Sequence, residues 1–457
     1  MQRSQIKNIQ NTKELRWLLL HVVLGVAIYL VPALAKAWGL LVLSLGVLII
    51  FNTKNRNHEV LLFCGYMVGS DVFLRMTGGD FFYEQIKYSI IVLLVLSMFV
   101  NRISSKSIWY LLYAVLLIPG IFVAAYDFSY ESDLRKSLSF NLSGPICLAV
   151  CAIYCYERNV SFRTLQNILF FTLLPIITMT IYLFIFTPNL QDVITGTQSN
   201  FEASGGFGPN QVSTILGLGM FILFIRFFFF SNTLLWKLIN LGLLAAVAYR
   251  GLLTFSRGGI ITATVISIAA ILSIMYFTNK TRVKRKVLTG LSLLSLVFLV
   301  VWMYSNVISK GLLEKRYNNQ NAAGIEKEDV STGRLDLIET ELIAFFENPI
   351  FGIGVGNNKF HRKQITGIDS AAHNEVSRTI AEHGSLGILA FMIVFLTPVT
   401  RFLTTHRNVF FFSFFLFWFL TINHSAMRIA APAFIYALSL LTITSENNTL
   451  HREQTTA

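Results

Sequence analysis

Charged residues and proline are both scarce in this sequence. Only 13% of its 457 residues are charged, whereas about a quarter are charged in soluble domains, and nine prolines leave long stretches without a helix breaker. Hydrophobic residues make up 54% of the chain, which is more than a soluble fold can bury. The composition therefore excludes an ordinary soluble domain and predicts a chain that lies largely in lipid.

Cysteine is also rare, and its pattern excludes a disulfide framework. Three of the four cysteines, Cys147, Cys151 and Cys155, recur at every fourth residue, so they share one helix face as small apolar fillers. No His-x-x-x-His motif or cysteine pair completes a metal site, and no Gly-x-Ser-x-Gly elbow is present. We therefore expect no metal, no cofactor and no serine hydrolase.

Apolar runs that can cross a bilayer recur along the chain, and they predict an all-α polytopic membrane protein with about 12–14 transmembrane helices. The runs cover 17–35, 38–51, 59–75, 86–100, 108–125, 142–157, 165–187, 211–230, 234–254, 259–277, 287–305, 384–400, 409–423 and 429–445. They divide the chain into N-terminal membrane helices (1–305), a long catalytic loop with short helices (306–383), and C-terminal membrane helices with a tail (384–457).

Charge alternates between the successive gaps of these runs. One set of gaps is basic, as at Lys54 and Arg56, whereas the alternate gaps hold acidic residues such as Asp80 and Glu84. The positive-inside rule then places both termini in the cytoplasm and the long loop on the outer side. Since the net charge of +13 has its source in these gaps, we expect no nucleic-acid partner.

Arg257 follows Ser256 and precedes two glycines, at the point where one apolar run ends and the next begins. A guanidinium at the edge of hydrocarbon either anchors the helix at the interface or binds an anion, and it matches phosphate oxygens bidentately. The gap is on the outer side, with Arg334 and His373, so the three residues can meet at one face.

Two candidates lie in the long loop. Arg334 opens a segment with helical apolar spacing that ends at Asn348-Pro349; a cation there opposes the helix dipole, so it is either a plain surface residue or a ligand contact. His373 lies at a polar–apolar boundary, where an imidazole either starts a helix or acts as a general base. The glycine run 352–357 predicts a turn and not a dinucleotide site, because no strand precedes it.

Further outward-facing residues are candidates for binding substrate, namely Arg135, Asn210 and Asn374. Asp71 and Arg75 lie one helical turn apart near the outer end of an early run. Their spacing predicts an ion pair, while a role facing substrate stays open.

The order of these elements resembles that of bacterial O-antigen ligases. From His373 the chain reads His, Asn, nine residues, then Gly-Ser-Leu-Gly, similar to the family signature His-(Asn/Ser/Gln)-x9-Gly-x-x-Gly. The FSRGG around Arg257 resembles the family's Ser-Arg-Gly element, and 331–357 resembles its Gly-Arg…Pro-x-x-Gly-x-Gly segment. The tryptophan that often follows Gly-Arg in the family is absent here.

This resemblance implies a metal-independent, inverting transfer of a glycan from undecaprenyl diphosphate at the periplasmic face of the bacterial inner membrane. It implies that Arg257 and Arg334 bind the diphosphate and that His373 assists the acceptor hydroxyl. Two guanidiniums would stabilise the charge of the departing group where water is partly excluded. In a ligase the acceptor is lipid A–core.

Two alternatives to a ligase stay open. A polymerase of O-antigen or exopolysaccharide repeat units uses a second lipid-linked glycan as acceptor, and related enzymes glycosylate proteins. The count of about fourteen runs favours a polymerase. The Arg-x10-Gly loop pairs associated with some polymerases are absent, which argues against one. A transporter of lipid-linked glycan also fits many spans, but here polar residues gather in one outer loop and not within the spans.

Overall fold

The structure, a computed structural model, describes residues 2–127, 134–231, 233–278, 281–327, 329, 333–367, 369–405 and 408–444. Within these residues the chain is helical apart from one short parallel pair of strands, β1 (Asn159–Ser161) and β2 (Thr442–Thr444), and an isolated bridge between Gln320 and Glu326. The predicted all-α polytopic class is confirmed.

The first half of the chain forms α1 (Gln2–Leu30), α2 (Ala33–Thr53), α3 (Glu59–Met76), α4 (Gln85–Val100), η1 (Ser105–Ser107), α5 (Ile108–Leu116), α6 (Ile118–Asp127), α7 (Leu134–Cys155), α8 (Phe162–Phe186), α9 (Leu190–Val193), η2 (Glu202–Ser204), α10 (Pro209–Ile225) and the π-helical turn η3 (Arg226–Phe230). The second half forms α11 (Leu234–Leu252), α12 (Arg257–Phe277), α13 (Thr281–Ile308), α14 (Leu312–Tyr317), α15 (Arg334–Glu347), α16 (Asn358–Thr366), α17 (Glu375–Thr405), α18 (Phe411–Ser425) and α19 (Ala431–Leu438).

Nine helical segments of the described residues are long and apolar enough to cross a membrane: Ala33–Thr53, Ser105–Tyr126, Leu134–Cys155, Phe162–Phe186, Pro209–Phe230, Leu234–Leu252, Arg257–Phe277, Val287–Ile308 and Glu375–Thr405. Helices α4 and α18 are apolar but shorter. The predicted number of spans is higher, partly because α3 carries three charged residues and because the run 429–445 holds only the eight-residue α19 before it turns into β2.

Several boundaries differ from those predicted. The first two runs are separated at Val31–Pro32 and not near residue 36, because proline cannot donate to a continuing helix and instead starts α2. The run 108–125 is divided at Leu117 into α5 and α6. At Gly384, by contrast, the backbone is not helical, with φ of +60° and ψ of −140°, so Glu375–Thr405 consists of two helices joined at a kink, in agreement with the predicted start of a run at residue 384.

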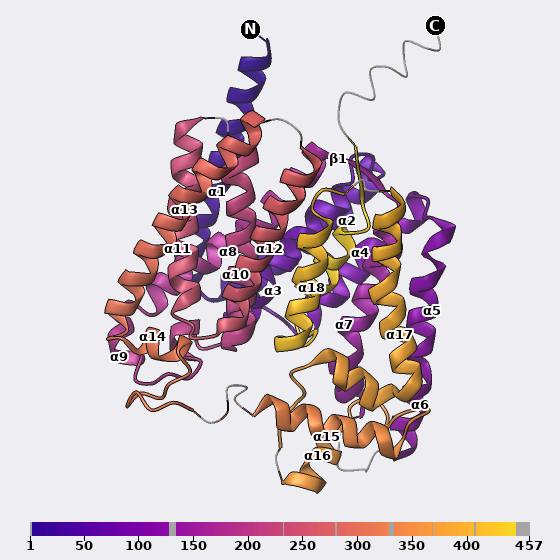
Figure 1. Cartoon of the computed structure of the whole chain (residues 1–457). Coiled ribbons are helices and arrows are strands. Elements are labelled where there is room, and N and C mark those ends of the chain that lie inside the picture. Colours follow the sequence, from indigo (N-terminus) through magenta and orange to yellow (C-terminus); the bar gives the residue numbers. More distant parts are fainter. Residues whose placement is uncertain are drawn as a thin grey trace, which may run out of the picture.

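The helices stand side by side, and the loop elements gather at one end of the bundle (Figure 1). Helix α8 packs against α1 and α3, while α10 and α18 pack against α12. The start of α1 and the strand pair lie at one end, and α14, α15 and α16 lie at the other, with α15 packed against α17 (Figure 1). The predicted apolar fillers Cys147, Cys151 and Cys155 are buried in α7.

Candidate active site

Arg257 is the first residue of α12 and lies in a tight turn against α10. Ser256 precedes it and donates from Oγ to Asn210 Oδ1 at 2.8 Å. A Cβ on Gly259 would lie 2.1 Å from the carbonyl oxygen of Ser213, so only glycine lets the two helices approach this closely. The turn therefore brings two predicted site residues, Arg257 and Asn210, to the same place.

Arg316, in the short loop helix α14, contacts this turn. Its Nε donates to the carbonyl oxygen of Phe255 at 3.1 Å, and Arg257 Nη1 donates to the carbonyl oxygen of Arg316 at 3.5 Å. Burial, together with the charges of Arg257 and Arg334, lowers the pKa of Arg316 to about 10. A third guanidinium, which the sequence did not suggest, thus lies with the two predicted ones.

Arg334 joins this group from the start of α15. Gly333 precedes it with φ of +79°, a left-handed conformation that suits glycine and turns the chain into the helix. Burial, and then the charge of Arg257, lowers the pKa of Arg334. The predicted helix is confirmed, since α15 ends at Glu347 before the Asn348-Pro349 pair. We call Arg257, Arg316 and Arg334 the guanidinium cluster.

The guanidinium cluster concentrates positive charge. Arg257 and Arg334 are the first residues of their helices, and neither helix start has a side-chain cap. Backbone N–H groups and the helix dipole at such starts attract anions, as guanidiniums do. Among the ion pairs of the described residues, none involves Arg316 or Arg334. The arrangement has the charge and the donors to bind a phosphate or diphosphate group.

His373 lies in the loop before α17, within reach of this charge. Its carbonyl oxygen accepts a hydrogen bond from Ala426 N at 3.1 Å, which ties the loop to the turn after α18. Burial, then the charges of Arg428 and Arg334 among others, lowers the pKa of His373 to about 4. The imidazole is therefore neutral at physiological pH, and this is the form that can accept a proton.

The end of α18 contributes a second histidine, His424, to the same face. Its ring lies against Gly258, where a Cβ would come within 2.5 Å of Cδ2, and it is among the groups that lower the pKa of His373. The predicted Asn374 donates from Nδ2 to Asn423 Oδ1 at 3.0 Å. The glycines of FSRGG thus make room for α10 and for this imidazole.

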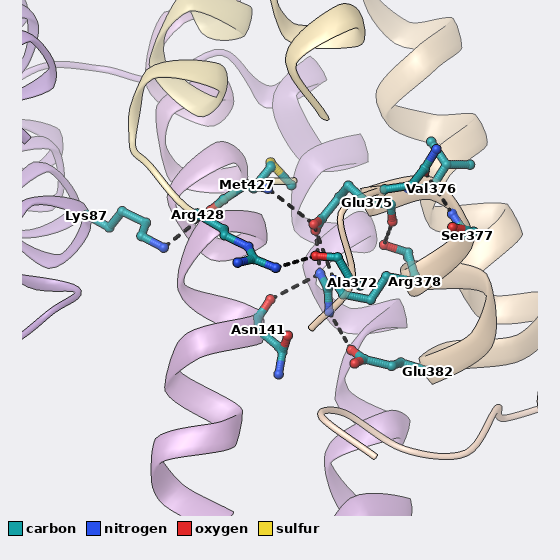
Figure 2. A network of polar contacts seen from close by, with 12 residues as sticks. Lys87, Asn141, Ala372, Glu375, Val376, Ser377, Arg378, Glu382, Met427 and Arg428 are labelled. Carbon is teal, nitrogen blue, oxygen red and sulfur yellow. Dashed lines mark hydrogen bonds and ion pairs between the residues drawn. The ribbon is translucent and has the colours of Figure 1, made fainter. Parts of the chain in front are cut away.

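Buried ion pairs hold the first turns of α17, the helix that follows His373 in the chain, in place (Figure 2). Arg378 pairs with both Glu375 and Glu382, and it donates from Nη2 to the carbonyl oxygen of Asn141 at 3.2 Å. A buried charge network of this kind is costly to break, because removing one partner leaves the others uncompensated. The network therefore fixes the helix that follows the candidate base.

Arg428 fixes the backbone next to His373. Its Nη2 donates to the carbonyl oxygen of Ala372 (Figure 2). The predicted pair of Asp71 and Arg75 is confirmed, with Arg75 Nε 2.9 Å from Asp71 Oδ1. This pair supports the same turn. Arg75 Nη1 donates to the carbonyl oxygen of Arg428 at 3.1 Å. Asp71 Oδ2 accepts a hydrogen bond at 2.7 Å from the backbone N–H of Ala430, the residue that precedes α19.

The glycine run 352–357 docks the long loop onto the membrane helices. Ile353 N donates to the carbonyl oxygen of Ala381, and Val355 N donates to that of Gly120, each at 3.0 Å. Gly352, Gly354 and Gly356 have positive φ, and a Cβ on any of them would lie within 2.5 Å of a neighbouring atom. The predicted turn is confirmed, and its glycines serve close packing.

Arg135 is the predicted residue that the structure does not bring to the guanidinium cluster. It lies exposed in the first turn of α7, where it lines a separate cavity of about 1260 Å³.

In the part of the chain that the structure describes, no three His, Cys, Asp or Glu side chains gather as metal ligands. Metal-free chemistry stays a prediction.

Comparisons with known proteins relate part of this chain to a known family. The family described as O-Antigen ligase matches residues 242–392, which contain the guanidinium cluster and His373, and the resemblance to the O-antigen ligase superfamily is thereby confirmed. The chain is also 29% identical over 173 residues to an uncharacterized protein of Haemophilus influenzae; this covers 34% of the chain and 41% of that relative's length. The family match and the apolar helices of the described residues agree with a multi-pass membrane protein.

Sequence reasoning missed Arg316, His424 and Arg428. Arg316 lies in a charged stretch without periodicity, and its contact with Phe255 joins residues 61 positions apart. Arg428 and His424 flank the turn between two apolar helices, where a single basic residue reads as an interfacial anchor. The sequence signal available for these three residues was their predicted place on the outer side of the membrane, which many other residues share.

Proposed function

We propose that this protein transfers a glycan from undecaprenyl diphosphate to an acceptor hydroxyl at the periplasmic face of the inner membrane, as an O-antigen ligase whose acceptor is lipid A–core. The observation that carries the proposal is the convergence of three guanidiniums with a neutral imidazole. The cluster supplies the donors for a diphosphate, and His373 supplies a base.

In the proposed step the acceptor oxygen bonds to the anomeric carbon of the donor sugar. The bond from this carbon to the diphosphate oxygen breaks, and its electron pair leaves with the diphosphate. The hydroxyl proton passes to His373, and Arg257, Arg316 and Arg334 stabilise the charge that grows on the leaving group. Attack opposite the leaving group inverts the anomeric configuration.

Both large substrates have to be held at one place, and the fold supports this. The loop elements gather at one end of the bundle, and the charge of the sequence predicts that this end faces the periplasm (Figure 1). Orientation of two bound substrates can supply much of a rate enhancement without covalent help from the protein.

Purified protein in liposomes with lipid-linked glycan and lipid A–core tests the proposal. We expect a new glycosidic bond with wild type and loss of most transfer with His373→Ala, while exposed Lys310→Ala in the same loop retains full activity. Chelator should not abolish transfer. Movement of glycan across the bilayer without bond formation would instead support a transporter.

Deletion of the gene followed by glycan profiling separates ligase from polymerase. Full-length chains that accumulate on undecaprenyl diphosphate support the ligase. Single repeat units attached to lipid A–core would support a polymerase, and loss of sugar from a protein would support a protein glycosyltransferase.

A further inference from the structure

The largest cavity among those described lies apart from the guanidinium cluster. Its volume is about 1260 Å³, and its lining comes from the segment before α4, from α4 itself, and from α6 and α7. None of α12, α14 or α15, which carry the cluster, lines it. The cavity is therefore a separate candidate binding site at the loop end of the bundle.

Its walls combine aromatic rings with polar groups. The rings of Phe82, Tyr83, Tyr88 and Phe140 line it, and the ring centroids of Tyr83 and Phe140 are 6.0 Å apart. Aromatic faces beside hydroxyl and carboxylate groups suit a sugar, which has apolar C–H faces and hydroxyls at its edge.

Glu84 gives the cavity a buried acceptor. Its Oε2 accepts from Ser143 Oγ at 2.9 Å and pairs with Lys87, whereas its Oε1 has no hydrogen-bond partner among the described residues. The residue is only 5% exposed, so this oxygen needs a donor, and a ligand hydroxyl can supply one. At the rim, Arg135 adds an exposed cation.

Three side chains, those of Arg428, Arg75 and Lys87, link the cavity wall to the turn beside His373. The guanidinium of Arg428 lies 5.5 Å from the ring centroid of Phe140 and binds the carbonyl oxygen of the residue before His373. Arg75 lies over the Tyr83 ring at 4.0 Å and donates to the carbonyl oxygen of Arg428.

The third link runs through Lys87. This residue pairs with Glu84 of the cavity and donates to the carbonyl oxygen of Met427 at 3.3 Å (Figure 2). The turn formed by Met427 and Arg428 therefore has the cavity wall on one side and the loop of the candidate base on another.

We infer that this cavity binds the saccharide of the acceptor, with Phe82, Tyr88 and Phe140 stacking on its sugars and Glu84 accepting from a hydroxyl. The inference rests on the proposed function, since the leaving diphosphate occupies the guanidinium cluster and the attacking hydroxyl has to come from elsewhere. Arg135 favours an acceptor that carries a negatively charged substituent.

Phe82→Ala with Phe81→Ala as its matched control tests the inference. The two neighbours are similarly exposed, at 53% and 57%, but only Phe82 lines the cavity. In the reconstituted assay we expect Phe82→Ala and Tyr88→Ala to raise the KM for acceptor by about threefold to tenfold, with the KM for donor unchanged. Phe81→Ala should match wild type.

Calorimetry with the acceptor saccharide alone gives a readout that does not need turnover. Wild type and Phe81→Ala should bind the saccharide with equal affinity. Phe82→Ala should bind it about threefold to tenfold more weakly, the factor expected for the KM for acceptor. If transfer occurs but neither the acceptor KM nor saccharide binding changes in Phe82→Ala and Tyr88→Ala, the inference is wrong while the proposed function stands. An effect on protein abundance alone, equal for Phe81→Ala, would show that these rings only anchor the protein at the interface. Absence of transfer by wild type would overturn the proposed function itself.

Discussion

In the proposed reaction, the diphosphate is bound by three arginine side chains, two of which have a pKa lowered by their arginine neighbours. Burial and the charges of neighbouring arginines lower the pKa of Arg316 and of Arg334. A bound diphosphate would relieve this repulsion, and the relief is a source of binding free energy. A fork-shaped guanidinium also contributes geometry that a point charge lacks.

Replacing Arg316 by lysine should therefore impair transfer although the charge is kept. Loss of a bidentate, charge-assisted contact costs about 1.5–3 kcal/mol, so kcat/KM for donor should fall about 10- to 150-fold. Initial rates over a range of donor concentrations measure this, with Lys310→Arg at an exposed position as control. Wild-type rates in Arg316→Lys would show that only charge matters there. We expect the same impairment for Arg257→Lys and Arg334→Lys.

The pH dependence of transfer should report on His373. The base has to be neutral, so activity rises with pH through its pKa and is flat above; with a pKa of about 4, kcat/KM should change little from pH 5 upwards. Removing a nearby cation raises that pKa, so in Arg334→Gln the acid limb should move to higher pH. An acid limb that stays in place in Arg334→Gln, or that persists in His373→Gln, would contradict the assignment.

At the scale of elements, the glycine run 352–357 docks the long loop onto the membrane helices. Gly354 has φ of +86°, and a Cβ there would lie 2.5 Å from Ala124 N in α6. Gly367, at the end of α16, has φ of +73° but nothing within 4 Å of a Cβ. A side chain at either position is disfavoured by the left-handed backbone, but only at Gly354 would it also overlap with a neighbouring helix. Comparing the two positions therefore isolates the free-energy cost of that overlap.

Gly354→Ala should destabilise the protein more than Gly367→Ala does. The left-handed conformation costs about 1–2 kcal/mol at either site, and overlap with α6 adds about 1–3 kcal/mol at Gly354 alone. Thermal unfolding in detergent and protease cleavage of the loop measure the difference. Equal midpoints for the two variants would mean that the run does not dock the loop.

Much of this fold could be predicted from the sequence, because apolar runs and their flanking charges are local signals. The helix after Arg334 and the pairing of Asp71 with Arg75 follow from spacing within one helix. The breaks at Pro32 and Leu117 were missed, since hydropathy alone does not show where a backbone turns. Arg316 was missed because its contact is set by packing between distant segments.

For the whole molecule, the central arrangement is that the loop helices α14, α15 and α16 lie at the end of the bundle opposite the start of α1 and the strand pair (Figure 1). All four cysteines are buried, so single cysteines introduced at exposed sites can be labelled selectively. A membrane-impermeant maleimide should label Lys359→Cys in α16 from the periplasmic side, and Lys106→Cys only after the membrane is opened. Labelling of both residues from one side would contradict the predicted orientation.

The most direct test of the account is the binding of undecaprenyl diphosphate to the purified protein. Wild type should bind it more tightly than undecaprenyl monophosphate and less tightly as salt rises, because guanidiniums hold the charged group. A variant with Arg257, Arg316 and Arg334 all replaced by glutamine should lose this binding while remaining folded. Equal affinity of wild type and that variant for the diphosphate would contradict the account.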